Sequence, residues 1–287
     1  MRRRFRLKSL LGGLVKMLAI GLLAVGLLGG YVKFVEPNWV AVTPVAVFVP
    51  DLPAELVGYR IVQITDVHAD SWMTPDRLSR IVDIINQQNP DLVALTGDYV
   101  TREPEKYAKT LLVLKALKPR DQVVAVLGNH DAWSNPQLIS QVLQEANVNV
   151  LANQVYTVRR GQAALAIGGL GDVWAKQDNL EQVLTQLPPT ASAVLLVHEP
   201  DFADTSAATG RFSLQLSGHS HGGQVVVPGM KLVLPPWGQK YPTGSYQVGT
   251  MTQYTSRGVG MARPRVRFNC RPEVTVLTLK LGAKLAT

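Results

Sequence analysis

The stretch Tyr59–His68, YRIVQITDVH, decides the fold, because a run of apolar and β-branched residues ends abruptly in polar ones. Its first part, Tyr59–Thr65, has the composition and length of a buried strand. Asp66 follows directly after this strand. A buried strand that ends in a carboxylate is typical of a site at the edge of a sheet.

The same arrangement recurs twice downstream. The segment Asp91–Thr96 predicts a second strand, which ends at Gly97-Asp98, and Gln122–Leu127 predicts a third, which ends at Gly128-Asn129-His130-Asp131. Helices are expected between and after these strands, with starts that resemble N-caps. They run from Thr74-Pro75 to Asn89-Pro90, over Glu103–Leu117, and from Ser134-Asn135-Pro136 to Ala146.

Beyond Ala146 strands predominate. Two βα units followed by a strand-rich half predict an α/β protein, a sheet sandwich flanked by helices. The expected later strands are Ala163–Gly168, Ala193–Val197, Phe212–Leu216, Ser245–Val248 and Val274–Leu279.

Five polar positions sit just past the ends of predicted strands. Open α/β sheets bind ligands outside the carboxyl ends of their strands, so these side chains are expected to meet in one crevice. They are Asp66, Asp98, Asn129, His198 and His219.

All five histidines of the chain fall in such loops, within two residues of glycine or acidic residues, and none lies on a predicted helix face. A lone loop histidine is ordinarily a hydrogen-bonded structural residue. Five of them in the same context indicate metal ligands. The histidines are His68, His130, His198, His219 and His221.

These residues carry a resemblance to the calcineurin-like metallophosphoesterases, and the match spans about Tyr59 to Lys280. The resemblance implies a four-layer α/β/β/α sandwich and hydrolysis of phosphate esters by a hydroxide held on two metal ions. The matching blocks, in order, are Asp66-Val67-His68, Gly97-Asp98, Gly128-Asn129-His130-Asp131, His198 and Gly218-His219-Ser220-His221.

The resemblance also implies a ligand set for two divalent ions. Asp98 would bridge both ions. Mixed imidazole and carboxylate ligands suit Mn²⁺, Fe or Zn²⁺ better than Ca²⁺. Asp66, His68 and His221 would bind the first ion, and Asn129, His198 and His219 the second.

His130 resembles the histidine of the family that binds no metal, which protonates the leaving oxygen or stabilises the transition state. Asp131 either orients His130 or fixes a backbone turn. The block Gly97–Arg102 resembles that of Ser/Thr protein phosphatases, but Thr101 replaces the Asp that partners the catalytic histidine there. This departure argues against a protein phosphatase. Arg102 either contacts a phosphate or is a solvated loop residue.

Within the superfamily, Ser217–Val225 (SGHSHGGQV), Ser256-Arg257-Gly258 and Arg271-Pro272-Glu273 resemble a bacterial branch of membrane-anchored or exported enzymes. That branch includes hydrolases of UDP-2,3-diacylglucosamine, which act in lipid A synthesis. The resemblance therefore implies a phosphodiester or pyrophosphate substrate on a lipid or nucleotide. A nuclease of the same superfamily and a non-catalytic binding module on this fold are the alternatives.

The N-terminal segment, residues 1–35, predicts a membrane anchor. Met17–Val32 holds sixteen residues without a charge, and the cluster Arg2–Lys8 before it is typical of a cytoplasmic flank. We expect a single-pass helix in the inner membrane, with the catalytic domain outside the cytoplasm. A nucleotide-sugar lipid substrate would favour the cytoplasmic side instead. A cleaved signal peptide, an interfacial helix and, from Arg2-Arg3-Arg4-Phe5, a twin-arginine signal are alternatives.

Charge is concentrated in this segment. Residues 1–35 carry seven of the 29 Lys and Arg and no acid, so 22 basic residues face 21 acidic ones elsewhere. The net charge of +8 therefore does not indicate nucleic-acid binding. Residues 36–58 predict a linker or edge segment, and 59–281 the phosphoesterase domain. The single cysteine, Cys270, is expected in the core.

Two groups of residues are candidates for substrate selection. Trp72 and Trp133 follow metal-binding motifs directly and would wall the cleft, unless they pack beneath loops. A run of arginines would hold a second phosphate or face anionic headgroups, unless it is a solvated strand face. The run consists of Arg257, Arg263, Arg265, Arg267 and Arg271.

Overall fold

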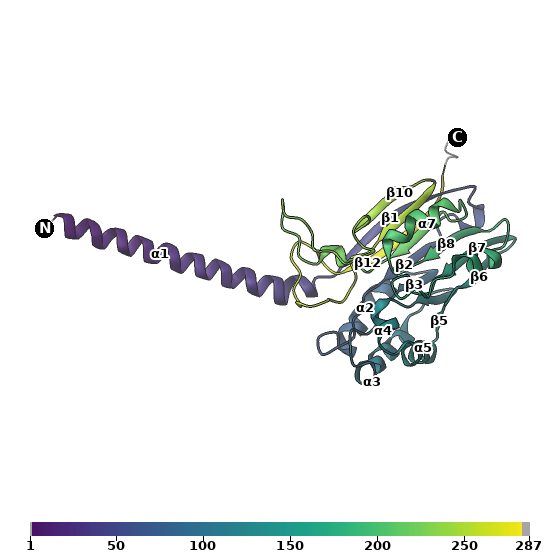
Figure 1. Cartoon of the computed structure of the whole chain (residues 1–287), viewed down its shortest axis with the longest axis horizontal. Helices are drawn as coiled ribbons and strands as arrows, with labels where there is room; N and C mark the ends of the chain where they lie inside the picture. The colour runs from purple at the N-terminus through teal and green to yellow at the C-terminus, as the bar shows by residue number, and fades with distance from the viewer. Residues whose placement is uncertain (1, 283–287) are drawn as a thin grey trace.

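The computed structural model describes residues 2–282, and it begins with a long helix that projects away from the domain (Figure 1). Helix α1 (Arg2–Gly30) continues into a π-helical turn (Tyr31–Val35) and a 3₁₀ turn (Glu36–Asn38). The stretch Gly12–Asn38 has a mean hydropathy of 2.0 in its most apolar window, and none of that window is buried by the domain. This exposed apolar helix fits a single-pass membrane anchor.

The first sheet has six strands in the order β1-β12-β2-β3-β4-β5. The strands β2 to β5 are parallel, and β12 lies antiparallel to β2 and parallel to β1. The bounds are β1 Ala41–Pro50, β2 Arg60–Ile64, β3 Leu92–Thr96, β4 Gln122–Val126, β5 Val148–Val150 and β12 Glu273–Gly282.

The second sheet also has six strands, in the order β10-β11-β9-β8-β7-β6. Its central strands β7, β8, β9 and β11 are parallel, and a hairpin partner closes each edge. The bounds are β6 Gln154–Arg160, β7 Ala163–Gly169, β8 Ser192–Leu196, β9 Leu214–Ser217, β10 Gly244–Val248 and β11 Met251–Thr255.

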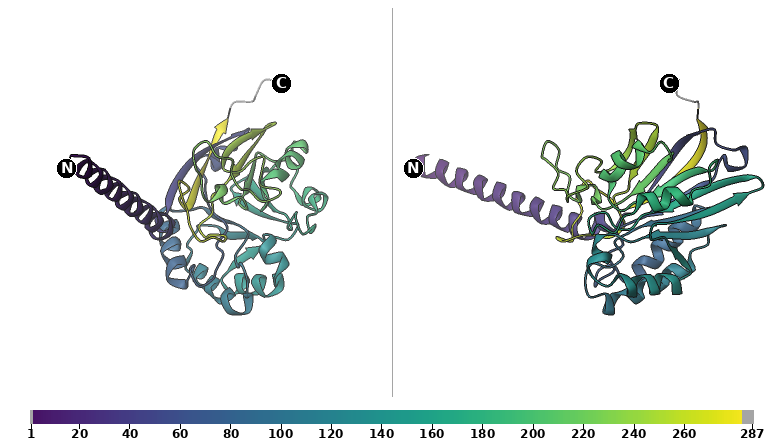
Figure 2. Two further views of the ribbon diagram at one scale, coloured as in Figure 1. Left: turned by 60° about the vertical axis from the view of Figure 1, so that its left-hand side comes forward. Right: turned by 45° about the vertical axis from the view of Figure 1, so that its right-hand side comes forward.

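Helices cover the outer face of each sheet. On the first sheet lie α2 (Pro75–Gln87), α3 (Pro104–Tyr107), a 3₁₀ segment (Ala108–Ala116) and α5 (Pro136–Glu145), and on the second α6 (Leu180–Gln186) and α7 (Ala203–Ala208). Figure 2 shows the helices of the first sheet gathered below it. Shorter turns are α4 (Asn129–Trp133), Ala54–Leu56, Pro200–Phe202 and His221–Gly223.

Alternation along the strands explains why the sheets stack. In β2, Val62 and Ile64 face the helices, whereas Ile61 packs in the core between the two sheets, where Leu165 and Leu216 of the second sheet meet it. A strand with apolar residues on both faces is buried on both sides. The predicted four-layer α/β/β/α sandwich is therefore confirmed.

The structure adds detail that the sequence pattern did not give. Within 36–58 lies β1, an edge strand that contains Pro44 and Pro50, residues tolerated there because one side of an edge strand needs no ladder partner. His130 and His221 were expected in loops, but they lie in the short helical turns α4 and His221–Gly223. Each turn directly follows a strand end, so the position of each histidine at the sheet edge is unchanged.

Candidate metal centre

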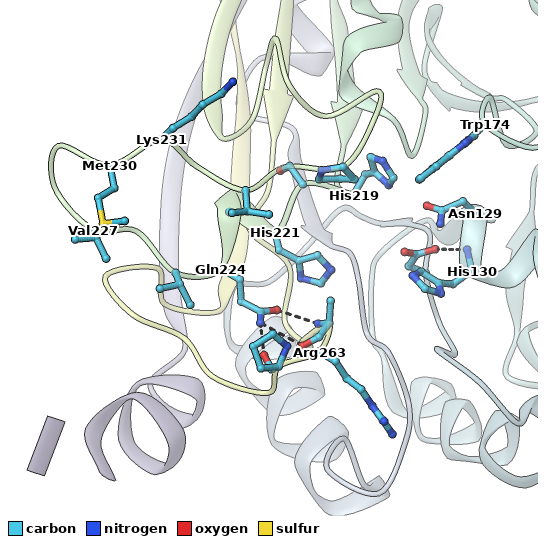
Figure 3. A pocket seen from close by; sticks show the side chains of 18 of the residues that line it. Asn129, His130, Trp174, His219, His221, Gln224, Val227, Met230, Lys231 and Arg263 are labelled. Carbon is cyan, nitrogen blue, oxygen red and sulfur yellow. Dashed lines mark hydrogen bonds between the residues drawn. The ribbon is translucent and has the colours of Figure 1, made fainter. Parts of the chain in front are cut away.

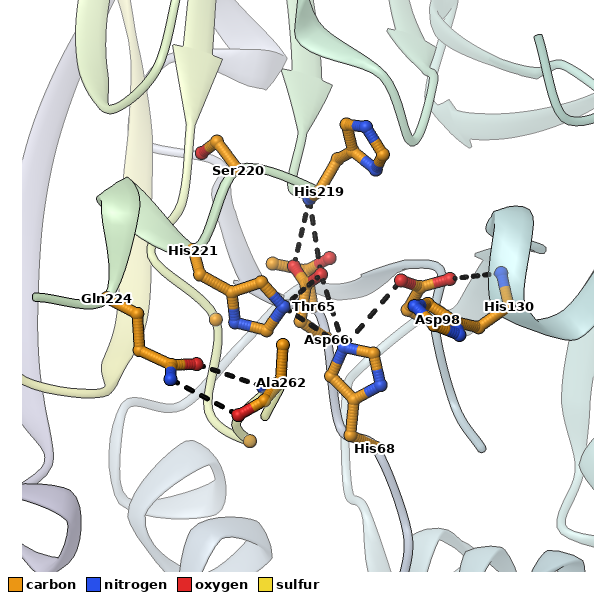
Figure 4. Close-up of polar contacts among 12 residues, drawn as sticks. Thr65, Asp66, His68, Asp98, His130, His219, Ser220, His221, Gln224 and Ala262 are labelled. Atoms are coloured by element: carbon orange, nitrogen blue, oxygen red, sulfur yellow. Dashed lines mark hydrogen bonds and ion pairs between the residues drawn. The ribbon is translucent and has the colours of Figure 1, made fainter. Parts of the chain in front are cut away.

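The predicted ligands meet where the carboxyl ends of strands from both sheets come together (Figure 4). The backbone there is unusual, because five of the seven residues have left-handed φ values, a conformation that costs energy for residues other than glycine. These are Asp66 (52°), His68 (48°), Asp98 (57°), His219 (72°) and His221 (52°). This concentration of strained backbone indicates that the positions of these side chains are maintained at a cost in backbone conformational energy.

Asp66, His68 and His221 form the first cluster. Asp66 Oδ1 lies 3.3 Å from His221 Nε2 and 3.8 Å from His68 Nε2. The two Nε2 atoms are 3.0 Å apart, and the rings are stacked with an interplanar angle of 18°. Two imidazole nitrogens and one carboxylate oxygen thus converge on one point, as a metal site requires.

Asp98, His198 and His219 form the second cluster. Asp98 Oδ2 lies 3.2 Å from His198 Nε2 and also 3.6 Å from His68 Nε2 of the first cluster. The carboxylate of Asp98 therefore lies between the two clusters. Asn129 is buried beside it.

Outer partners fix the orientation of the rings. His198 Nδ1 lies 2.7 Å from the carbonyl oxygen of Thr96, so it carries a proton and donates, which directs Nε2 toward the clusters. His219 Nε2 donates to the carbonyl of Pro236 at 2.8 Å, which leaves its Nδ1 bare. Backbone carbonyls thus select the tautomers that metal binding needs.

Buried atoms without a protein partner test whether the residues fit a metal pair. Asn129 Oδ1 and His198 Nε2 are both buried and accept no hydrogen bond from the protein. An orphaned buried acceptor is costly unless something else satisfies it. These atoms belong to residues of the implied second site, so the donor set fits two divalent ions.

The pKa directions agree with ligand chemistry for three of the four proposed histidine ligands. Burial lowers the pKa of His68 to about 4 and that of His219 to about 3, and the pKa of His221 falls well below its usual value for the same reason. These imidazoles are therefore neutral, the form that binds metals. Burial raises the pKa of Asp66 to about 6. Burial also opposes charge on His198, but Asp98 outweighs it and holds the pKa of His198 well above its usual value.

His130 lies at the rim of the two clusters. Its backbone N–H donates to Asp98 Oδ1 at 2.9 Å, and its ring centroid is 5.1 Å from that of His68, with the rings edge-to-face. One of its ring nitrogens also lies near His68 and Asp98, in a third group of possible ligands. The structure thus brings His130 to the site, but its position alone does not distinguish a proton donor from a metal ligand.

Asp131 is committed to the backbone. Its carboxylate accepts N–H groups from Tyr99 at 2.9 Å, Val100 at 3.2 Å and Gly128 at 3.0 Å. Burial and the charge of Asp98 raise the pKa of Asp131 to about 8, whereas the backbone donors lower it. Of the two roles left open by the sequence, this geometry favours fixing the turns that carry Asp98 and His130.

A pocket of about 560 Å³ opens over the metal clusters (Figure 3). Trp133 and Trp174 form one wall, with ring centroids 4.7 Å apart, and Trp174 also meets the ring of His219 at 5.6 Å. The opposite wall is largely apolar. It includes Val225, Val227, Met230, Val233 and Pro235.

Only one of the two predicted tryptophans lines this pocket. Trp133 does, but Trp72 packs against the core beneath α2, with the Arg77 guanidinium 4.3 Å from its ring centroid. The sequence pattern did not predict that Trp174 lines the pocket. Glu199 holds that loop, accepting the N–H groups of Val173 at 3.3 Å and Trp174 at 3.1 Å. Burial raises the pKa of Glu199 to about 8.

The arginine run is neither a phosphate cluster nor a solvated strand face. Arg267 is fully buried and donates to the carbonyls of Gly258, Gly260 and two other residues. Arg257 pairs with Glu273 at 2.9 Å, and Arg265 pairs with Asp70. Arg271 donates to the carbonyls of Trp39 and Val40 and stacks on the ring of Trp39. Arg263 alone among the five lines the pocket, and Arg102 is exposed and absent from its lining.

Comparisons with known proteins agree with this geometry. The chain is 33% identical over 286 residues to "Uncharacterized metallophosphoesterase YkuE" of Bacillus subtilis (strain 168), covering 98% of each chain. It is 31% identical to "Phosphodiesterase YaeI" of Escherichia coli (strain K12), covering 87% of this chain and 92% of the relative. It is 28% identical to "UDP-2,3-diacylglucosamine pyrophosphatase LpxG" of Chlamydia trachomatis serovar D, covering 86% and 91%.

The sequence profile described as "Calcineurin-like phosphoesterase" matches residues 59–223, more than half of the chain. Members of this family use a pair of divalent metal ions, and the two clusters around Asp98 supply candidate ligands for such a pair. The chain therefore belongs to the calcineurin-like phosphoesterase family and is a metal-dependent phosphoester hydrolase.

Proposed function

We propose that the protein hydrolyses a phosphodiester or pyrophosphate in a lipid- or nucleotide-linked substrate, at a site where Asp98 is shared by two metal ions. The observation that supports this most directly is the position of Asp98 Oδ2, 3.2 Å from His198 and 3.6 Å from His68. One carboxylate within reach of two imidazole clusters is what a bridged metal pair requires.

The proposed ligands follow the two clusters. Asp66, His68 and His221 would hold one ion, and Asn129, His198 and His219 the other, with Asp98 common to both. Bound there, Mn²⁺, Fe or Zn²⁺ would supply Lewis acidity toward the phosphoryl group and toward an attacking water. His68, His219 and His221 are neutral and would bind the ions without losing a proton, whereas the proton that Asp98 favours on His198 would leave as the ions bind.

His130 is the proposed acid. Its backbone is tied to Asp98 Oδ1, so the ring is held at the mouth of the pocket, beside both clusters. A proton on this ring would pass to the oxygen of the leaving group. Asp131 would assist indirectly, by holding the turn that carries His130.

The substrate proposal rests on the pocket and on one relative. The wall formed by Val225, Val227, Met230 and Val233 suits an apolar substituent better than a polynucleotide. The relative named as a UDP-2,3-diacylglucosamine pyrophosphatase makes that compound the first substrate to test. Near-neutral charge outside residues 1–35 also disfavours the nuclease alternative.

We further propose a division into an anchor (1–35), a connecting segment (36–58) and the catalytic domain (59–281). The basic cluster before the apolar helix supports a single-pass protein of the inner membrane with its domain outside the cytoplasm.

A substrate panel tests the proposal. Full-length protein in detergent is stripped with chelator, reloaded with Mn²⁺, Fe²⁺ or Zn²⁺, and given bis-p-nitrophenyl phosphate, its monoester and UDP-2,3-diacylglucosamine. We expect no turnover after stripping, recovery on reloading, and preference for the diester or the pyrophosphate. Preference for the monoester would contradict the substrate class. A folded, metal-loaded protein that turns over none of the three esters would favour the binding-module alternative.

A further inference from the structure

An exposed apolar segment, Val225–Trp237, forms the outer wall of the pocket. We call it the apolar loop. Met230 is 68% exposed and Val233 is 88% exposed, values that are unusual for side chains without a polar atom at their tips. Val225, Val227 and Trp237 are exposed as well. Scattered exposed apolar residues are ordinary, but several within thirteen residues indicate a surface that another apolar phase covers.

The apolar loop is joined to the base of the anchor. Val226 N–H donates to the carbonyl of Phe268 at 2.8 Å, so the start of the apolar loop pairs with the segment that carries Arg267. Arg267 N–H in turn donates to the carbonyl of Val32 at 3.0 Å, at the end of the apolar run of the anchor. Tyr31 and Pro228 line one crevice. The apolar loop therefore starts at the level where the anchor leaves the domain.

This junction is rigid. The buried guanidinium of Arg267 donates to four backbone carbonyls, and Cys270 N–H donates to the buried carboxylate of Glu36, just beyond α1. The bonds of this charged donor fix the segment 257–270 within the domain, and the backbone N–H groups of Arg267 and Cys270 tie that segment to Val32 and Glu36 at the end of the anchor. The domain is thus held in one orientation relative to the helix, with the apolar loop on the side from which α1 projects (Figure 1).

Residues typical of a membrane interface occur at the junction and along the apolar loop. Trp39 and Trp237 are about half exposed, and Phe34 is 65% exposed. Lys231 of the apolar loop and Arg263 are exposed cations that line the same pocket (Figure 3). Aromatic rings and cations that flank an apolar surface are typical of the headgroup region of a bilayer.

We propose that the apolar loop lies in the headgroup and upper acyl region of the bilayer that α1 spans, so that the mouth of the pocket opens onto the membrane. The occupant of this surface is lipid rather than another protein, because the apolar run of α1 ends at the same hydrogen-bonded junction. An amphipathic phosphoester can then enter the pocket with its acyl part still in the bilayer. The proposal depends on the anchor but not on the hydrolytic activity.

The test measures lipid contact directly. Met230→Cys and Val233→Cys are made separately in full-length protein carrying Cys270→Ala, labelled with a nitrobenzoxadiazole probe and reconstituted in lipid nanodiscs. Gln162→Cys is the matched control, since it is exposed in the turn of the β6–β7 hairpin, far from α1 (Figure 2). Spectra are recorded with and without lipids that carry a doxyl quencher near the headgroup.

We expect blue-shifted emission and at least twofold quenching at position 230 or 233, and neither at position 162. Quenching at both loop positions no greater than at position 162 would overturn the proposal. A blue shift without quenching by lipid would also overturn it, because a protein surface would then cover the apolar loop. Since no activity is measured, failure here leaves the proposed hydrolysis to be judged by the substrate panel.

Discussion

The hydroxyl oxygen of Thr101 lies 3.0 Å from Nδ1 of His68, the ring nitrogen that faces away from the metal clusters. Thr101 stands where Ser/Thr protein phosphatases have an aspartate that partners their catalytic histidine. In this protein it instead contacts a proposed metal ligand. With Nε2 of His68 directed at the clusters, Nδ1–H donates to the Thr101 oxygen, which fixes the orientation of the ring.

Removal of this hydrogen bond tests its contribution to metal binding. We expect Thr101→Val to weaken binding of one metal ion by about 10–100-fold, the usual effect of losing an outer partner of a ligand. Thr101→Ser keeps the hydroxyl and is the control, expected within about threefold of wild type. Competition titration against a fluorescent chelator gives both affinities. Equal affinity in the valine variant would show that the contact does not orient His68.

His130→Ala separates the acid from the ligands. We expect two metal ions to stay bound while kcat falls about 10²–10⁴-fold, the range of general acid catalysis. The loss should shrink for esters with good leaving groups, because these need less protonation. Elemental analysis and rates on activated and unactivated esters provide the measurements. Loss of one metal ion from the folded variant would make His130 a ligand instead.

Asp98→Asn is expected to behave differently. It removes the charge shared by the two clusters, so both metal content and rate should fall, with a decrease in kcat/KM of about 10²-fold or more on every ester, irrespective of leaving group. The same elemental analysis serves as readout. Retention of two metal ions at wild-type affinity would contradict the bridging role.

The Glu273–Arg257 pair gives a prediction for pH. Burial raises the pKa of Glu273, but Arg257 and a hydrogen bond from Tyr254 outweigh it, so the pKa lies below its usual 4.5. Because the pKa of Glu273 is lower in the folded protein than its value of 4.5 in the unfolded chain, ionised Glu273 stabilises the fold above pH 4.5. This stabilisation is lost as the pH falls through the pKa of the folded state. We expect Glu273→Gln to lower the free energy of unfolding by about 1.5–3 kcal/mol at pH 7.

The difference in the free energy of unfolding between wild type and Glu273→Gln should shrink below pH 4.5, as the carboxylate of Glu273 becomes protonated. Urea unfolding of both proteins at pH 7 and pH 4 measures it, and other acid-sensitive groups cancel in the comparison. A difference that is constant or larger at pH 4 would refute the assignment.

The apolar helix α1 leads to a prediction about which conditions extract the protein from membranes. Burial of an apolar helix is insensitive to ionic screening, so full-length protein should stay in the membrane pellet in 1 M salt, at a Debye length of about 3 Å, and dissolve only in detergent. Immunoblots of washed membranes measure the distribution. Release by salt alone would mean that the protein is held at the surface by charge.

The features predicted from the sequence were those with a local signal. The strand ending at Asp66 has a buried apolar run and an abrupt polar end, and the structure begins β2 only one residue later than expected. The free, buried Cys270 was also expected. The convergence of the polar residues could be predicted because the carboxyl ends of parallel strands share an edge.

Features that depend on distant contacts were missed. The sequence does not distinguish a linker from an edge strand at β1, because Pro44 and Pro50 obscure the strand signal and the partner strand β12 lies more than 200 residues away. Trp174 belongs to an irregular loop held by Glu199, so no spacing rule places it at the pocket. The burial of Arg267 depends on carbonyls that only the folded chain gathers.

The position of β12 has a consequence for how the protein folds during its synthesis. This strand lies between β1 and β2, so the first sheet is incomplete until residues 273–282 have been synthesised. Until then β1 has no partner strand, and an unpaired strand edge can pair with the wrong strand. A chain cut short before Glu273 would leave that gap open. Synthesis of β12 is therefore the step that lets β1 join the first sheet.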